Sequence, residues 1–307
     1  MKNVLIFCAS DSLTQQLITY LEEQGYSVFI HNPFGTNQHK NTGYWVNDLN
    51  DLQHIPLHYV VNLSCDSLFN KKWSEKNKNK MIDDCVFATR DLYEWLKSNN
   101  KRPLQIITAS SVGYYGICGF DQWDHVCDEN DLPQPFFLSK IYQELEYEAL
   151  CFDQNTKIMR FGYIFEKEYG PLKILLKPIL KEVYGYTGGG YNPVPWIHVN
   201  DACRAIEFLF KSDTNKTFFN AVAPDELVQK VFCDTSCQHF NKKPKFNKVP
   251  YFVFRLIYGE KADLITNGKH CMPISLINEG FKFKYERYNL ALINLSQHKK
   301  TECNSIL

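Results

Sequence analysis

The chain has 307 residues, enough to bury one large hydrophobic core and a smaller second one. Its 34 lysines and arginines balance 34 aspartates and glutamates, so no basic excess indicates a nucleic-acid partner and no polybasic tail indicates a membrane surface. No apolar stretch approaches the length of a membrane span, and the apolar run at the start is too short for a signal peptide. The eleven scattered cysteines favour reduced thiols and a cytoplasmic location over a disulfide framework.

Apolar strands alternate with amphipathic helices in the first half of the chain. The expected strands are Asn3–Phe7, Tyr26–His31, His58–Leu63, the stretch that begins at Gln105, and Lys157–Ile164, and the expected helices are Ser12–Gln24, part of Asn77–Asn99, and Pro135–Cys151. In the first helix leucines recur every four residues, Ser12 with Gln15 resembles a capping box, and Gly25 ends the helix. This alternation predicts an α/β fold, a Rossmann-type doubly wound parallel sheet.

The pattern loosens after Ile164. We expect an amphipathic helix near Leu172–Val183, regular structure again at Trp196–Val199, and a helix that begins with Asp201 as its N-cap. Short helices and turns follow from Ala221 on. The predicted division is therefore a Rossmann-type domain of residues 1–164 and 196–220, and a smaller C-terminal cap or substrate domain of residues 165–195 and 221–307.

The stretch Gln105–Gly116 reads as a buried strand that ends in hydroxyl-bearing residues, Ser110, Ser111, Tyr114 and Tyr115. Ligands of open α/β sheets bind at the carboxyl ends of the strands. We therefore expect these side chains to lie at the rim of a binding site.

The turn after the first strand has an unusual composition for a dinucleotide site. Such a turn normally carries glycines that let the pyrophosphate approach the helix N-terminus, but residues 7–14 contain none, and Asp11 would bring a carboxylate near the phosphates. His31 and Asn32 stand where an acidic residue would hold a ribose diol. An ordinary strand–turn–helix is an equal alternative here, and the preference between NAD and NADP stays open.

Motifs along nearly the whole chain resemble those of the extended short-chain dehydrogenases/reductases, and most closely of the nucleoside-diphosphate-sugar epimerase-like proteins sometimes labelled cell-division inhibitors. The matching stretches are Val61–Ser64, Trp73–Glu75, Ala88–Arg90, Ala109–Gly116, Arg160–Gly162, Trp196–Asp201, Asn220–Pro224, Pro250, Arg255, Gly259–Glu260, Ala262–Asp263, Pro273 and Glu279–Phe283. The resemblance implies a Rossmann domain that binds NADP or NAD, and a small C-terminal domain. By position, the cofactor-binding residues would be Ala9, Ser10, Ser12, Leu13, His31, Asn32, Leu63, Ser64, Lys140, Phe161 and Gly162.

The resemblance also implies a catalytic set. The superfamily uses a Ser or Thr hydroxyl, a Tyr phenol, and a Lys one helical turn later that lowers the pKa of the phenol. Lys140 matches the Lys, but Phe136 occupies the Tyr position and cannot transfer a proton. Ser110 matches the epimerase-like subfamily and Ser111 the superfamily's catalytic hydroxyl, with a slight preference for Ser110. The candidate catalytic residues are Ser110, Ser111, Tyr114 and Lys140.

Three further residues are candidate substrate contacts: Tyr115, Trp196 and His198. Each has a structural alternative. The tyrosine pair Tyr114–Tyr115 could pack a loop, Trp196 could anchor the core, and His198 could join the two predicted domains through hydrogen bonds. Arg160 could likewise bind an anionic substrate or form a buried structural ion pair.

No metal site is expected. Cys233, Cys237 and His239 offer soft ligands, but no second cluster completes a zinc site, and four-residue spacing on a helix is ordinary packing.

Three functions are compatible with these residues. The first is an NAD(P)-dependent oxidoreductase or epimerase acting on a sugar nucleotide or related carbonyl compound. The second is a non-catalytic relative that acts as a binding or regulatory protein, because the turn glycines and the phenol are both missing. The third is a site between the domains that binds an unrelated small molecule. A homodimer would form through the helices of Asn77–Leu96 and Pro135–Cys151, as is common in the superfamily.

Overall fold

Seven parallel strands form the central sheet of the computed structural model, in the order β10-β7-β5-β4-β1-β2-β3. Their bounds are β1 Asn3–Cys8, β2 Ser27–His31, β3 Tyr44–Val46, β4 Tyr59–Leu63, β5 Gln105–Ser111, β7 Lys157–Phe161 and β10 Phe218–Ala221. The structure describes residues 1–8, 12–35, 42–65, 73–117, 125–153, 156–168, 170–182, 186, 188–243, 252, 255–256, 259, 262–263 and 267–297. The central strands are covered on both faces, which explains their continuous apolar runs.

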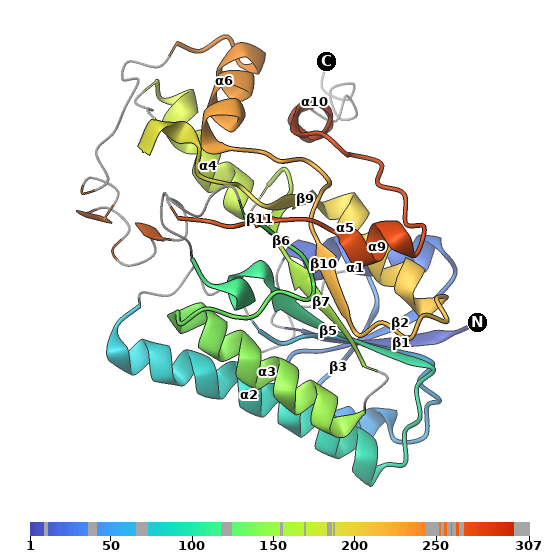
Figure 1. Ribbon diagram of the computed structural model, residues 1–307. Helices are drawn as coiled ribbons and strands as arrows, with labels where there is room; N and C mark the ends of the chain where they lie inside the picture. Colours follow the sequence, from blue (N-terminus) through green and yellow to red (C-terminus); the bar gives the residue numbers. More distant parts are fainter. Residues whose placement is uncertain are drawn as a thin grey trace, which may run out of the picture.

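Helices cover the two faces of this sheet (Figure 1). On one face lie α1 (Ser12–Glu23) and α5 (Val199–Phe210), which contact each other and share a core with β1, β2 and β4. On the other lie α2 (Glu75–Ser98) and α3 (Phe137–Phe152), side by side. The predicted doubly wound α/β sheet is therefore confirmed.

A separate apolar cluster lies beyond the carboxyl edge of the sheet. It is formed by α4 (Gly170–Leu180), α6 (Gln229–His239) and α10 (Tyr288–Ser296), which pack around Phe165 and Trp196. The remaining elements are η1 Leu49–Leu52, η2 Val112–Tyr115, β6 Val126–Cys127, β8 Tyr163–Phe165, η4 Gly188–Gly190, β9 Trp196–His198, β11 His270–Cys271 and α9 Ile274–Asn278. A smaller C-terminal region is thus present, while the boundaries of the two domains stay a prediction.

Two details of the predicted elements are corrected. The strand expected over Lys157–Ile164 is interrupted at Gly162, because β7 pairs with β5 and β10 whereas β8 pairs with β9. Asp201 is not an N-cap: α5 begins two residues earlier, and the imidazole of His198 accepts the N–H of Asn200. The carboxylate of Asp201 instead accepts the backbone N–H groups of Lys284 and Tyr285.

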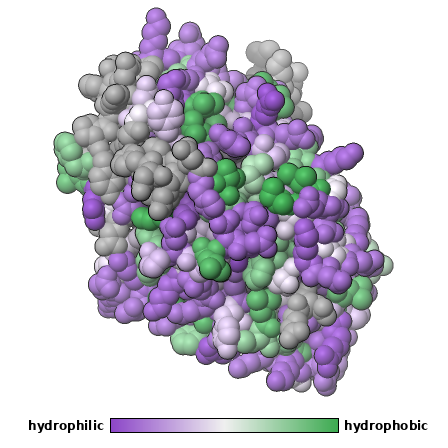
Figure 2. Space-filling view, viewed as in Figure 1, coloured by the Kyte–Doolittle hydropathy of each residue, from purple (hydrophilic) through white to green (hydrophobic). Residues whose placement is uncertain are grey.

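The face shown in Figure 2 is mostly hydrophilic among its described residues, with apolar side chains in separate small patches. Phe87 on α2 and Tyr147 on α3 are exposed. The homodimer expected through these two helices stays a prediction. Within the described ranges, every helix is too short or too polar to cross a bilayer.

Candidate active site

Five strands end at one edge of the sheet, at Cys8, His31, Leu63, Ser111 and Phe161. The parallel registers bring these ends together: Cys8 lies opposite Leu63, Phe7 opposite His31, and Ser111 opposite Phe161. This carboxyl edge is where open α/β sheets bind ligands. Two of the predicted cofactor residues, Ala9 and Ser10, lie outside the described residues together with Asp11. Ser12 begins α1, but its side chain, and with it the proposed capping box, lies outside the description too.

Four of the other predicted cofactor residues at this edge are buried. Leu13, Leu63 and Phe161 are buried members of the sheet's core. Ser64 is buried, and its hydroxyl contacts the Thr89 hydroxyl at 3.2 Å. These contacts support the shape of the edge, while direct contact with a cofactor stays a prediction.

His31 ends β2 and Asn32 follows it, and both residues are half-buried. The Nδ1 of His31 contacts the Val46 carbonyl oxygen at 3.2 Å, and burial lowers the pKa of the imidazole. The Asn32 side-chain oxygen accepts the Phe34 N–H at 2.9 Å. The end of β2 therefore presents two neutral groups at neutral pH.

Gly162 lies where the chain passes from the central sheet to β8. Its N–H donates to the Ala221 carbonyl, and a Cβ there would meet the Pro195 carbonyl oxygen and a Val222 methyl, each at 2.8 Å. A side chain would force these segments apart. The glycine thus permits a close approach of backbones, which is a structural reason for its presence.

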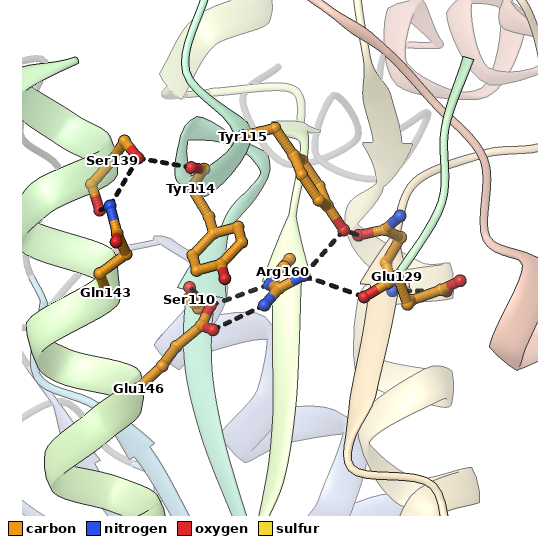
Figure 3. Close-up of polar contacts among 9 residues, drawn as sticks. Ser110, Tyr114, Tyr115, Glu129, Ser139, Gln143, Glu146 and Arg160 are labelled. Carbon is orange, nitrogen blue, oxygen red and sulfur yellow. Dashed lines mark hydrogen bonds and ion pairs between the residues drawn. The ribbon is translucent and has the colours of Figure 1, made fainter. Parts of the chain in front are cut away.

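A buried ion pair lies beneath the edge (Figure 3). Arg160 on β7 donates from Nε and Nη2 to the two carboxylate oxygens of Glu146 on α3, at 2.9 and 2.7 Å. The side chains are 2% and 5% exposed, so both charges are withdrawn from water. Burial alone would lower the pKa of Arg160, but the Glu146 carboxylate outweighs it and raises that pKa. Arg160 thus holds a structural ion pair, one of its two predicted alternatives.

Ser110 belongs to the same buried network. Its hydroxyl donates to Glu146 Oε1 at 2.5 Å, and the residue is 5% exposed. The hydroxyl proton is therefore already engaged, and the carboxylate it contacts is balanced by Arg160. This placement favours a structural role for Ser110.

The two tyrosines of η2 also contact Arg160. The guanidinium carbon lies 3.6 Å from the centre of the Tyr114 ring. The Tyr115 hydroxyl accepts from Arg160 Nη1 at 3.0 Å and donates to Asn220 Oδ1 at 2.7 Å. Tyr115 is fully buried, and burial raises the pKa of its phenol. In this structure both rings pack around the ion pair, so the loop-packing alternative accounts for their positions.

Ser111, by contrast, is half-buried at the very end of β5. Its oxygen accepts the Gly113 N–H at 3.1 Å. The ring of Tyr142 on α3 lies beside Gly113, and burial raises the pKa of the Tyr142 phenol well above its usual value. Sequence reasoning missed Tyr142, although it lies six residues after Phe136 on the same helix. The Gly113 N–H holds the Ser111 oxygen in place.

Lys140 lies in the first turn of α3, at the same end of the sheet. The helix is attached to η2 because the Ser139 hydroxyl donates to the Tyr114 carbonyl at 2.7 Å. The Lys140 side chain is 66% exposed and 3.9 Å from Glu144, so its ammonium is accessible to a ligand. Phe136 packs near Trp73, with ring centres 6.1 Å apart, in an apolar cluster.

The predicted substrate contacts Trp196 and His198 are buried. Trp196 stacks on Phe165 with ring centres 5.4 Å apart, which makes it part of the second apolar cluster. His198 accepts the Asn200 N–H through Nδ1, contacts Asn294 Oδ1 through Nε2 at 3.2 Å, and stacks on Tyr285. Burial lowers its pKa to about 4. Both residues hold segments together, and their contact with a substrate stays a prediction.

The structure also places possible metal-ligating groups together at a position that sequence reasoning missed. Donor atoms of His125, Cys127 and Asp131 lie within 4.8 Å of one another. Cys233 and Cys237, considered from the sequence, are instead buried packing residues on α6.

Comparison with known proteins decides the family. Residues 10–221 match the model of the NAD dependent epimerase/dehydratase family, and residues 249–295 match a domain of unknown function, DUF1731. The chain belongs to the NAD-dependent epimerase/dehydratase family. An epimerase family protein of Staphylococcus aureus, SAR0825, is 30% identical over 96% of this chain and 99% of its own length. The epimerase family protein YfhF of Bacillus subtilis is 29% identical over 97% of this chain and 99% of its own length.

Solved structures share the fold of this epimerase-family chain. The human epimerase family protein SDR39U1, solved with NADPH, has a TM-score of 0.82 at 19% identity and covers 95% of this chain and 98% of its own. UDP-N-acetylglucosamine 4-epimerase from Bacillus cereus has a TM-score of 0.74 at 16% identity and covers 96% of this chain and 98% of its own. At these identities the likeness shows the fold.

Proposed function

We propose that this protein binds NADP or NAD at the carboxyl edge of its sheet and acts as an epimerase or reductase on a sugar nucleotide or related carbonyl compound. The observation that carries the proposal is the pairing of a half-buried hydroxyl, Ser111, with an exposed ammonium, Lys140, on two elements that are attached to each other. A hydroxyl and a lysine near the end of this strand are what such chemistry needs to hold a substrate oxygen and a cofactor ribose.

Each side chain has a distinct proposed role. Ser111 holds the reacting oxygen of the substrate, and the Gly113 N–H keeps the Ser111 hydroxyl oriented. We prefer Ser111 over Ser110 because Ser110 already donates its proton to Glu146. Lys140 would hold the ribose hydroxyls of the nicotinamide nucleotide. When bound, that nucleotide would supply the hydride acceptor and donor.

The charge at the end of β2 favours neither NADPH nor NADH. A carboxylate after β2 would bind a ribose diol and repel a 2′-phosphate, but His31 and Asn32 stand there and are both neutral at neutral pH. We therefore propose binding of both NADPH and NADH with little discrimination. The human relative that was solved with NADPH supports the cofactor class, and the relative named as a UDP-N-acetylglucosamine epimerase supports the substrate class.

We expect slow turnover because Phe136 occupies the position of the catalytic tyrosine. General acid–base catalysis by a placed side chain contributes roughly 10² to 10⁴-fold to a rate. Phe136 packs in an apolar cluster and contributes no proton. Turnover by this chain is therefore proposed to be slow, with orientation by Ser111 and Lys140 as its main source.

Binding and turnover test the proposal separately. Calorimetric titration with NADPH and with NADH should show binding that weakens about tenfold or more in Lys140→Ala, because a charge-assisted contact contributes about 1.5 to 3 kcal/mol. Lys97→Ala is the matched control: Lys97 is an exposed lysine in the last turn of α2, at the opposite edge of the sheet. Equal loss in both variants, or no heat and no thermal stabilisation at millimolar cofactor, would contradict the binding proposal.

Turnover is then measured with UDP-N-acetylglucosamine as the probe, by product analysis and by nicotinamide absorbance. We expect conversion that is lost in Ser111→Ala while NADPH binding is kept. A protein that binds NADPH but converts neither this probe nor other sugar nucleotides would reject the catalytic part and retain the binding part.

A further inference from the structure

Two cysteines from distant parts of the sequence lie directly opposite each other in a small parallel pair of strands. Cys127 ends β6 and Cys271 ends β11, and the register pairs the two residues. The Met272 N–H donates to the Cys127 carbonyl at 2.9 Å, which holds the two strands in that register. Paired residues on neighbouring strands point to the same face, so the two thiols meet.

The distance between the two chains suits a covalent link. Neighbouring strands lie about 4.8 Å apart, and a disulfide requires Cα atoms about 4.4 to 6.8 Å apart. The Cys271 thiol donates to the Lys269 carbonyl oxygen at 3.7 Å, which holds it in place on the strand that is paired with Cys127. Both residues are present as thiols in this structure.

The surroundings of the pair distinguish Cys127 from a packing cysteine. Lys269 and His125 place positive charge near it, and Asp131 places a negative charge. Two cysteines held in register on neighbouring strands, with positive charge beside one of them, are the arrangement of a redox-active pair.

We propose that Cys127 and Cys271 form a reversible disulfide on exposure to hydrogen peroxide, a modification site that links β6 to β11. The pair is 1% and 8% exposed, so the oxidant must be small and uncharged. The side chain of His125 is 58% exposed, and its ring nitrogen lies within 4.8 Å of the Cys127 sulfur.

The chemistry balances in two steps. The Cys127 thiolate attacks one oxygen of the peroxide, the O–O bond breaks, and a sulfenic acid forms while the released hydroxide takes up a proton to become water. The Cys271 sulfur, losing its proton, then attacks the Cys127 sulfur and displaces the second oxygen as water. Two thiols lose two hydrogens in all, and one peroxide is reduced to two waters.

A resident metal ion is the competing use of the same cluster, since His125, Cys127 and Asp131 offer three donor atoms. The charge of Lys269 acts on all three of these residues and on Cys271. That positive charge opposes a cation but favours a thiolate. The redox pair is therefore the better account of the residues present.

Peptide mapping of the full chain tests the proposal. The protein is treated with increasing hydrogen peroxide, alkylated under denaturing conditions and digested at lysine and aspartate, which separates Cys127 from Cys118. We expect the linked Cys127–Cys271 peptide to become the major form, and a reductant to restore both thiols. A buried pair in the same chain, Cys233 and Cys237 on α6, is the internal control and should stay alkylatable.

Variants identify the steps. Cys127→Ser should abolish the linked peptide, Cys271→Ser should leave a sulfenic acid on Cys127 that a dimedone probe traps, and Cys151→Ser, at an exposed cysteine, should leave the linkage unchanged. Two results would overturn the proposal. One is oxidation of Cys151 and Cys65 while Cys127 and Cys271 remain thiols. The other is purified wild-type protein that carries one equivalent of zinc, lost in Cys127→Ser.

Discussion

At the scale of single residues, Glu146 carries a buried charge whose stability depends on its partners. Its carboxylate accepts two bonds from Arg160 and one from Ser110, and all three residues are at most 5% exposed. Removing one charge of such a pair leaves the other in a medium that solvates it poorly. The network also fixes η2, because Tyr114 and Tyr115 both contact the same guanidinium.

Glu146→Gln should therefore lower the free energy of unfolding by about 3 to 5 kcal/mol, since it leaves the Arg160 charge buried and unbalanced. Urea denaturation monitored by circular dichroism measures the change. Glu144→Gln, two residues earlier on α3 and 42% exposed, is the control and should stay within about 0.5 kcal/mol of the wild type. Equal effects of the two substitutions would show that Arg160 finds another counter-charge.

His198 makes stability depend on pH. Burial lowers its folded-state pKa to about 4, while the unfolded chain keeps a value near 6.5, so the unfolded state binds the proton first as pH falls. Its contribution is complete above pH 6.5 and is lost between about 6.5 and 4, a change of about 3 kcal/mol. His198→Asn, which still offers an oxygen to cap α5, should flatten the stability curve over that range.

Unfolding free energies measured from pH 7 to 4 for wild type and for His198→Asn decide this point. His54→Asn, at an exposed histidine, should reproduce the wild-type slope. Burial also lowers the pKa of His31, so a residual dependence of the unfolding free energy on pH should remain in every protein compared. A variant curve parallel to the wild type would mean that His198 is protonated without cost.

Residue types alone could not show which of the two serines faces the buried ion pair and which faces the candidate site. Ser110 and Ser111 are identical and adjacent, and alternation along β5 turns one toward Glu146 and the other toward the carboxyl edge. Which side faces the ion pair depends on Glu146 and Arg160, which are distant in the sequence. The position of Lys140 was predictable because it depends on local spacing on one helix.

At the scale of elements, apolar runs predicted the central strands and apolar periodicity predicted the main helices. β4 and β7 are buried along their whole length, which is what a two-sided sheet requires of its sequence. The end of α1 was also predictable, since Gly25 adopts a φ of 84° that favours glycine.

Elements that depend on distant partners were not predictable. Asp201 has the chemistry of an N-cap, but residues 284 and 285 supply N–H groups to its carboxylate, and His198 caps α5 in its place. β6 and β11 are only two residues long, and each forms because it pairs with the other across nearly half the length of the chain. A local pattern carries no signal for such pairing.

At the scale of the whole molecule, Glu129 joins three separate segments. Its Oε1 accepts the backbone N–H of Asn220 on β10 at 2.9 Å and that of Ser275 on α9 at 3.1 Å, while its own carbonyl oxygen accepts from Arg160. Leu276 and Phe281, which follow Ser275, are buried in the core of the sheet. The buried network thus extends from the ion pair to the C-terminal segment that closes that core.

Glu129→Ala should loosen this connection without unfolding the sheet. It leaves two buried N–H groups without their acceptor, at a cost of roughly 1 to 3 kcal/mol each. Hydrogen–deuterium exchange of α9 and of residues 279–283 should then accelerate about tenfold or more, because local opening no longer breaks those bonds, while β1 and β4 keep wild-type protection. Glu168→Ala, at a carboxylate that is 67% exposed, is the control and should change neither region. Uniform acceleration in β1, β4 and α9 would mean that the C-terminal segment and the sheet open as one cooperative unit, in which case Glu129 stabilises the molecule globally instead of joining two parts that can separate.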